Sequence, residues 1–262
     1  SLAMQGVTSI ASMVRGELLP IVVRAASETW IRVRSILKDV DVREYGSRIK
    51  SALKNVVEPD AVTKEIVTFG YCTRIGGELS KDLEDVEGVL YLTLDKVDLI
   101  PTRILEKVVC MNCSEAVQRV IQRNVVVDDY KRWKVGQALT FSSARFLNPR
   151  LYLYEVLKCN LTAFDELALA TVWNSSNLRI GMDSIEIGKP ADMIILNFRE
   201  PPGGPLPADI QGIAEAIASG EYVVESVIVG GEIVVDRGEP LMVGLSLFKR
   251  VEKTCESLRR TP

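Results

Sequence analysis

Histidine is absent from this sequence of 262 residues. Imidazole is the commonest metal ligand and the usual proton carrier near neutral pH, so the chain has no site built on its own histidines. An excess of charge of one sign is also missing, since 32 basic and 35 acidic residues leave a net charge of only −3. Without a basic surplus, the composition gives no support for a nucleic-acid partner.

Long apolar runs are missing as well. No run reaches the roughly 18 residues that suggest a membrane span, and the first residues lack the basic and apolar regions of a secretory signal. We therefore expect a cytoplasmic protein without a membrane partner. Hydrophobic residues make up 47% of the chain and charged residues 26%, which is typical of a chain that buries one good core.

Cysteine is too scarce and too scattered for a secreted disulfide framework. The five cysteines are at positions 72, 110, 113, 159 and 255. Cys110 and Cys113 form a C-x-x-C pair, a pattern of redox dithiols and of half zinc sites. A structural zinc site needs four donors, and no second pair lies at a suitable spacing. Buried thiols or an incidental disulfide are therefore favoured over a metal or redox role.

Short apolar runs alternate with helical patterns along the first 140 residues. The apolar runs lie near residues 7, 31, 65, 89, 108, 125 and 138, and the clearest helices between them cover 17–29 and 43–57. Strands that alternate with helices indicate βαβ units and a parallel sheet. Seven strands are one fewer than a (β/α)₈ barrel needs. We predict an α/β fold with an incomplete or distorted TIM-type barrel.

The stretch 162–238 predicts a helix followed by a small sheet. Thr162, with Asp165 three residues later, is a capping box before an apolar helix. Strands are predicted over 184–187, 192–197, 222–229 and 232–235. Gly230-Gly231 predicts a type I′ hairpin turn, because both central positions of that turn need positive φ. The predicted organisation is a barrel over 1–180, a small sandwich-like β domain over 181–245 and a C-terminal helix over 246–262.

Two segments carry a pattern that extends beyond their local structure. The C-terminal segment has Ala170-Thr171, Asn174, Gly188-Lys189-Pro190-Ala191-Asp192, Val229-Gly230-Gly231 and Gly238 in that order, and the N-terminal segment has Gly6-Val7-Thr8-Ser9-Ile10. Together they resemble the two ends of the amidohydrolase superfamily, the metal-dependent hydrolases and deaminases of the chlorohydrolase and cytosine-deaminase kind. The resemblance implies a TIM-type barrel that hydrolyses C–N bonds with metal-activated water, with the substrate at the barrel mouth.

The resemblance also implies a metal site that this sequence does not reproduce. In the superfamily, the ligands follow the barrel strands: an H-x-H pair on strand one, often Lys or Glu on strand four, histidines on strands five and six, and Asp on strand eight. We expect the H-x-H strand to be missing from this chain. The strand-eight position is Phe141, which cannot bind a metal. We therefore predict no cofactor, where the superfamily implies zinc or another divalent metal.

The missing first strand has a consequence for assembly. In the superfamily, N-terminal strands complete the small β domain together with the C-terminal ones. A half-complete sandwich leaves an unpaired edge and an exposed apolar face, which soluble proteins rarely tolerate. We predict a homo-oligomer or a partner chain that completes the small β domain.

The remaining motifs have simpler interpretations. The S-x-x-K matches at 35–38 and 47–50 lack the other elements of a serine–lysine enzyme, which indicates chance. Asp128-Asp129 is a possible carboxylate pair, but a helix N-cap with a solvated neighbour is favoured. The loop 201–205 lacks the glycine spacing and the lysine of a phosphate-binding loop.

Three functions remain open, because the fold alone does not decide whether the chain is an enzyme. The favoured one is an amidohydrolase-like, non-catalytic protein for small-molecule binding or assembly. The second is a metal-dependent C–N hydrolase whose H-x-H segment is missing from this chain or comes from a partner. The third is a metal-independent enzyme that uses Asp95, Asp128 or Cys110. The residues expected to line the barrel mouth are Asp95, Asn112, Asp128, Thr140 and Arg145.

Overall fold

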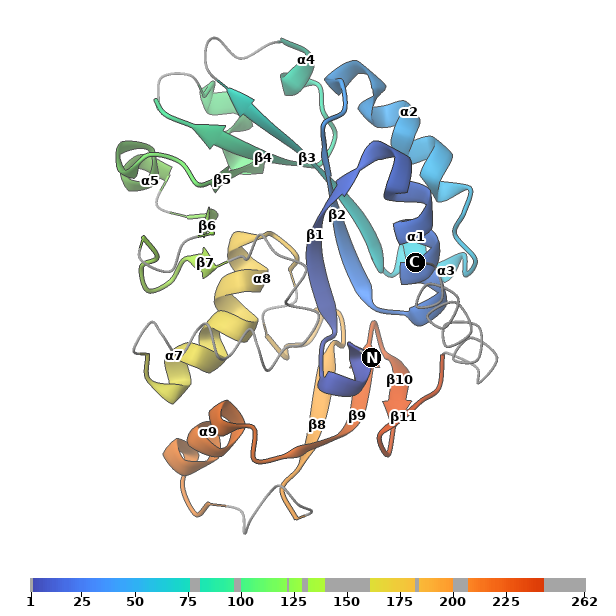
Figure 1. Cartoon of the computed structure of the whole chain (residues 1–262), viewed down its shortest axis with the longest axis vertical. Coiled ribbons are helices and arrows are strands. Elements are labelled where there is room, and N and C mark those ends of the chain that lie inside the picture. Colours follow the sequence, from blue (N-terminus) through green and yellow to red (C-terminus); the bar gives the residue numbers. More distant parts are fainter. Residues whose placement is uncertain are drawn as a thin grey trace, which may run out of the picture.

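The computed structural model describes residues 2–75, 81–96, 100–121, 123–128, 132–139, 161–181, 184–199 and 207–242. Seven parallel strands form one sheet in sequential order, and Figure 1 shows this sheet curled into an open half-barrel. The strands are β1 (Ser9–Arg15), β2 (Arg32–Lys38), β3 (Val67–Ile75), β4 (Val89–Leu94), β5 (Val108–Met111), β6 (Val125–Val127) and β7 (Ala138–Leu139). The seven strands predicted from the sequence are thus confirmed, and among the described residues the sheet remains open between β1 and β7.

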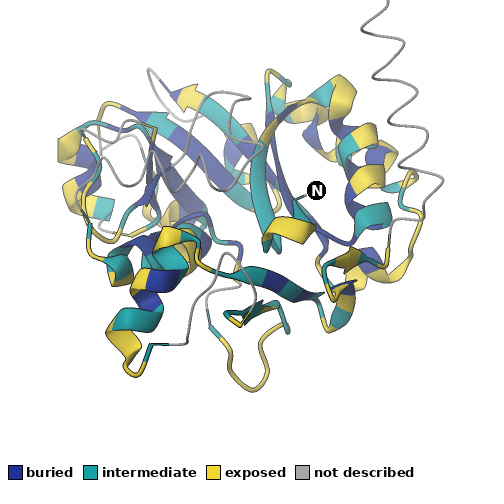
Figure 2. Ribbon diagram, turned by 60° about the horizontal axis from the view of Figure 1, so that its bottom comes forward, coloured by how far each residue is buried: buried dark blue, intermediate teal, exposed yellow. Residues whose placement is uncertain are grey.

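Helices between these strands cover the convex face of the sheet. They are α1 (Leu19–Thr29), α2 (Val42–Leu53), α3 (Asp60–Thr63), α4 (Lys81–Glu84) and α5 (Glu115–Ile121), with short 3₁₀ turns at Ala3–Gln5, Gly16–Leu18 and Thr102–Lys107. Figure 2 shows the buried strands behind helices that expose only their outer sides. On α1, Leu19 and Val23 are fully buried because they recur on the side that faces the sheet.

The concave face of the sheet is filled with side chains. Because successive side chains of a strand point to opposite faces, every second residue of each strand points inward. The inward cluster consists of Ile36, Tyr91, Val109, Met111, Val126, Ala138, Leu178 and Ile180. As in closed barrels, the interior is a packed core and not a pore.

The helix after β7 begins at the predicted cap. The Thr162 hydroxyl accepts a hydrogen bond from the Asp165 N–H at 3.2 Å. The helix runs through α7 (Ala163–Ala168), a π-helical turn (Leu169–Trp173) and α8 (Asn174–Asn177). Leu178 and Ile180 then enter the inward cluster, so the end of this helix closes one end of the half-barrel.

A second, antiparallel sheet is built from the C-terminal strands. These are β8 (Met193–Asn197), β9 (Val223–Val229), β10 (Glu232–Asp236) and β11 (Glu239–Pro240), in the order β11-β10-β9-β8, and α9 (Ile210–Ser219) connects β8 to β9. Gly230 and Gly231 have φ of 59° and 83° between β9 and β10, which confirms the predicted turn.

The strand predicted over 184–187 is wrong, since these residues form no strand. The alternation of isoleucine with polar residues has the period of a strand, but no strand among the described residues pairs with it. Ile185 is 80% exposed and Ile187 is fully exposed. A local pattern cannot reveal whether a partner strand lies within reach.

The two sheets pack against each other through an apolar cluster at the amino ends of the parallel strands. Ile66 before β3 is fully buried with Val227 and Val229 of β9. The Trp30 indole N–H in the same cluster donates a hydrogen bond to the Val229 carbonyl at 3.0 Å. The small sheet therefore has one face in a core shared with the half-barrel.

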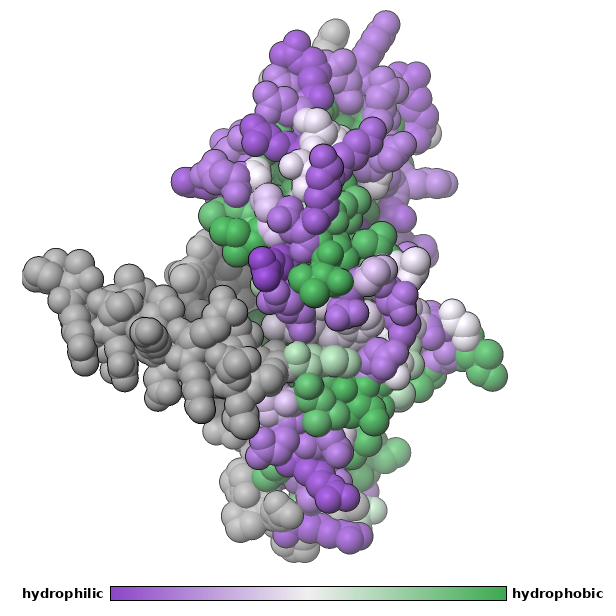
Figure 3. Space-filling view, turned by 90° about the vertical axis from the view of Figure 1, so that its right-hand side faces the viewer, coloured by the Kyte–Doolittle hydropathy of each residue, from purple (hydrophilic) through white to green (hydrophobic). Residues whose placement is uncertain are grey.

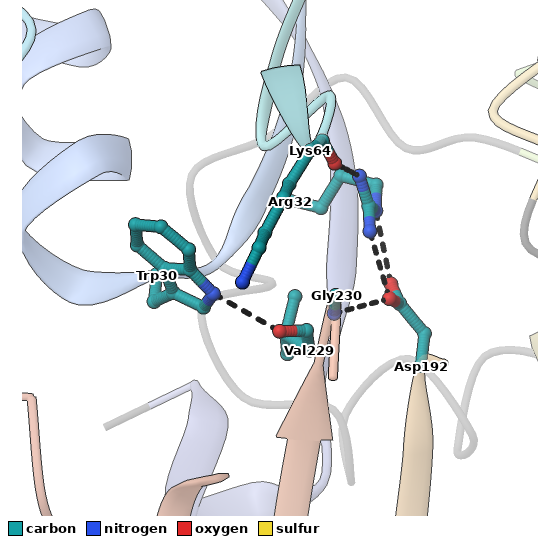
Figure 4. A network of polar contacts seen from close by, with 6 residues as sticks. All are labelled: Trp30, Arg32, Lys64, Asp192, Val229 and Gly230. Atoms are coloured by element: carbon teal, nitrogen blue, oxygen red, sulfur yellow. Dashed lines mark hydrogen bonds and ion pairs between the residues drawn. The ribbon is translucent and has the colours of Figure 1, made fainter. Parts of the chain in front are cut away.

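A buried ion pair crosses the same junction (Figure 4). The Arg32 guanidinium binds both Asp192 carboxylate oxygens, at 2.8 and 3.0 Å, and the two side chains are only 1% and 3% exposed. Arg32 also donates to the Lys64 carbonyl at 2.6 Å, and the Gly230 N–H donates to Asp192 at 2.8 Å. The pair joins β2 to the start of β8 and to the β9–β10 turn.

The other face of the small sheet is apolar and partly exposed. Ile195 and Ile233 are each 48% exposed on this sheet. Figure 3 shows apolar surface at the level of the small sheet. The predicted association with another copy or another chain remains a prediction.

The predicted boundaries after residues 180 and 245 also remain predictions. The closing helix over 246–262 and the loop over 201–205 lie outside the described residues. Within the described ranges, no helix combines the length and the apolar character needed to cross a membrane.

Candidate functional site

The carboxyl ends of β2, β3 and β4 surround a pocket of about 390 Å³. It is lined by Lys38, Asp39, Val40, Asp41, Tyr71, Cys72, Thr73, Arg74 and Thr93. Parallel strands all end at the same edge of their sheet, and (β/α) barrels place their sites at this carboxyl edge. We call this set of residues the rim pocket.

Two cations of the rim pocket have no partner among the residues that the structure describes. Lys38 ends β2 and Arg74 lies near the end of β3; alternation places both on the concave side, because their neighbours Leu37 and Ile75 pack among the helices. Within the described part of the chain, neither side chain makes an ion pair or a hydrogen bond. Both are therefore free to bind a ligand.

The acidic groups of the rim pocket offset these cations only in part. Asp41 caps α2 by accepting from the Arg43 N–H at 2.9 Å, and the Arg43 guanidinium binds its carboxylate at 2.8 and 3.1 Å. The hydrogen bonds from Arg43 lower the pKa of Asp41 to about 2. Asp39 is the one carboxylate of the lining without such a partner among the described contacts. Two free cations against one free carboxylate leave the rim pocket with a positive balance.

The neutral side chains shape the pocket without supplying a nucleophile. The Tyr71 hydroxyl donates to the Val40 carbonyl at 2.7 Å and fixes the turn that follows β2 against β3. Burial raises the pKa of the Cys72 thiol, although Lys38 opposes this effect. Cys72 is therefore a protonated thiol at neutral pH, and a thiol reacts far more slowly than a thiolate.

The structure brings two of the predicted mouth residues together. Asn112 follows β5, and its side-chain oxygen accepts from the Asp128 N–H after β6 at 3.0 Å. Asp95 follows β4, and its carbonyl accepts from the Ser114 hydroxyl at 3.0 Å. These three residues follow the strands at the carboxyl edge, but none of them lines the rim pocket. Thr140 and Arg145 lie outside the described residues, so the five assignments remain predictions.

Sequence reasoning missed the two free cations. For Lys38 the signal was a charged residue at the inward position of an otherwise buried strand. Arg32, Arg34, Ile36 and Lys38 share one face of β2, so Lys38 is the last inward residue of that strand. Arg74 lies beyond the run predicted near residue 65, because β3 extends to Ile75, so counting along the predicted strand would not have identified it.

The C-x-x-C pair lies away from the rim pocket. Cys110 and Cys113 lie next to each other, and both are completely buried among residues that face the helices. Buried thiols and an incidental disulfide both remain predictions. Because Cys110 is buried on the helix side of the sheet, it does not line the rim pocket.

By sequence, neither a family model nor a curated protein matches the chain. By structure, the chain shares its fold with solved hydrolases and a deaminase, the kinds of enzyme that the resemblance named. A triazine hydrolase variant superimposes with a TM-score of 0.62 at 13% identity, covering 97% of this chain and 73% of that chain. An adenosine deaminase from Xanthomonas campestris with bound zinc gives 0.63 at 13% identity, with 100% and 73% covered. Zinc-complexed atrazine chlorohydrolase TrzN from Arthrobacter aurescens TC1 gives 0.59 at 12%, with 96% and 73% covered. Identities this low establish the fold alone.

These structures correct the prediction that no cofactor is involved. Two of the proteins with this fold hold zinc. The absence of histidine from this chain is therefore not enough to predict that the protein has no cofactor. Among the described residues, no three Cys, Asp or Glu side chains form a group that could hold a metal ion. A catalytic zinc needs about three protein donors, so these residues alone do not fit it, and no chemical step is assigned to a metal.

Proposed function

We propose that the protein binds a small anionic molecule in the rim pocket. The observation that carries this proposal is the pair of unpartnered cations, Lys38 and Arg74, on one lining. A free guanidinium offers a two-pronged donor to carboxylate or phosphate, and a lysine adds a mobile point charge. The volume of about 390 Å³ falls in the range of small-molecule sites.

Asp39 narrows the class of ligand. Its carboxylate shares the lining with Lys38 and has no partner of its own among the described contacts. It repels a second negative charge and favours a ligand with a donor or a positive group beside the anionic one. Thr73 and Thr93 supply hydroxyl groups that orient the rest of the molecule.

Matched pairs of probes test this function. We expect succinamate, which has one carboxylate and one amide donor, and inorganic phosphate, at a pH where it is mainly the monoanion and at constant ionic strength, to raise the melting temperature of the protein. Neutral succinamide should leave it unchanged. The shift should disappear in Lys38→Met and persist in Lys50→Met, which removes an exposed cation of α2 outside the rim pocket. An equal shift with succinamide, or an equal loss in both variants, rules out the proposal.

A second candidate function is a zinc-dependent C–N hydrolase completed by another polypeptide. It is supported by the open side of the half-barrel between β1 and β7 and by the zinc held in proteins of the same fold. Here a strand in this opening supplies the ligands that the described residues lack. Metal analysis of the native complex and of the purified chain tests it. Zinc at one equivalent in the complex alone supports it, and zinc at one equivalent in the isolated chain contradicts it.

A further inference from the structure

The first strand of the parallel sheet has a free edge. β1 pairs with β2 on one side, and no other described strand borders it. Met13 and Ile36 are register partners that both point inward, yet Met13 is 44% exposed and Ile36 only 3%. Among the described residues, nothing therefore covers Met13 on the concave surface beside β1.

A buried cation lies beside this edge without a counter-charge. Arg34, the register partner of Ala11, is 8% exposed. Its guanidinium donates to the Arg179 carbonyl at 2.8 Å, its Nε has no hydrogen-bond partner, and no described carboxylate pairs with it. A desolvated charge without a counter-ion is strongly destabilising.

The groups around Arg34 do not provide the missing negative charge. The Tyr91 hydroxyl lies near it and donates to the Leu178 carbonyl at 2.7 Å. Burial raises the pKa of Tyr91 to about 12, so this phenol stays neutral at physiological pH. Ala11, the register partner of Arg34 on β1, has no charged or polar side chain to offer the guanidinium.

The geometry of barrels indicates where a counter-charge would enter. Closed (β/α)₈ barrels fill their interior with layers of four side chains, each layer contributed by alternate strands. Arg34 lies on β2, and β2, β4 and β6 are alternate strands of this sheet. The fourth strand of that set falls between β7 and β1, on the free edge of β1.

We propose that the free edge of β1 binds a parallel β-strand from another polypeptide, and that an inward Asp or Glu of this strand pairs with Arg34. Backbone hydrogen bonds to β1 supply affinity, as in other cases of strand addition, and the carboxylate supplies selectivity. The strand also covers Met13. The inference is independent of anion binding at the rim. The proposed pairing also bears on the second candidate function, because it gives Arg34 a role in recognising the added strand that does not involve binding a metal.

Two synthetic peptides test the inference. Each is a Val/Thr strand of seven residues, flanked by lysines for solubility, with either Asp or Asn at the centre. We expect the Asp peptide to bind the full chain at least tenfold more tightly than the Asn peptide, measured by fluorescence anisotropy. Equal affinities for the two peptides overturn the inference.

Two further measurements distinguish pairing of the peptide with Arg34 and β1 from non-specific binding of the peptide to an apolar surface. In Arg34→Met the preference for Asp should vanish, whereas in Arg15→Met, at the carboxyl end of the neighbouring strand β1, it should remain. Bound Asp peptide should also slow amide hydrogen exchange in β1 and leave exchange in β3 unchanged. Uniform protection of both strands, or a preference for Asp that survives in Arg34→Met, contradicts the proposed pairing.

Discussion

At the scale of single residues, the Arg32–Asp192 pair has the strongest structural role. Both side chains are almost fully buried and bound through two hydrogen bonds, so loss of one partner leaves an unpaired charge in the core. The sequence pattern marked Asp192 through the Gly188-Lys189-Pro190-Ala191-Asp192 string. Its partner could not be predicted, because Arg32 is 160 positions away in the chain.

We predict that Asp192→Ala lowers the free energy of unfolding by about 3–5 kcal/mol, because it leaves the buried Arg32 charge unpaired and removes the acceptor of the Gly230 N–H. Guanidinium chloride denaturation measures the change. The matched control is Glu232→Ala, which removes a half-exposed pair with Lys64 and should cost less than about 1 kcal/mol. Similar losses in the two variants would show that the buried pair is not special.

At the scale of elements, the strands of the half-barrel were predictable because each carries its own signal. A buried parallel strand is a short, continuous apolar run, and Val125–Val127 is visible even at three residues. Pairing is not local, so the false strand at 184–187 was not distinguishable from β8. The contribution of α8 was also hidden, because its asparagines bind strands that lie far from it in sequence.

Among the residues that join one element to another, we expect Asn177 of α8 to contribute most to stability. Its side-chain oxygen accepts from the Val125 N–H at 2.9 Å, and its amide donates to the Gly136 and Trp173 carbonyls at 2.8 Å. Asn177→Ala leaves a buried backbone N–H unsatisfied and should cost about 1–3 kcal/mol.

Thermal unfolding and amide hydrogen exchange at Val125 measure this effect. Exchange at Val125 should become faster in Asn177→Ala. Asn177→Asp retains the acceptor and should preserve most of the protection at that amide. Asn55→Ala is the control, since Asn55 binds carbonyls at the partly exposed end of α2. Unchanged exchange at Val125 in Asn177→Ala would refute the role assigned to this side chain.

At the scale of the whole molecule, the open half-barrel assembles the rim pocket from strands that follow one another in the chain. The sequence predicted the edge at which a site would form, because that edge is a property of parallel sheets. It did not predict which residues converge there. Lys38 and Arg74 line one pocket because β2 and β3 are neighbouring strands, and the expected residues follow β4, β5 and β6 instead.

The affinity of the rim pocket for an anion is the most direct test of the proposed function. Inorganic phosphate is titrated calorimetrically, at constant ionic strength, into the wild-type chain, Arg74→Met and Lys50→Met. We expect Kd to rise at least tenfold in Arg74→Met, equivalent to about 1.4 kcal/mol, and to stay unchanged in Lys50→Met. The same Kd in all three proteins, or no binding to the wild-type chain, would contradict an anion site at the carboxyl edge of this sheet.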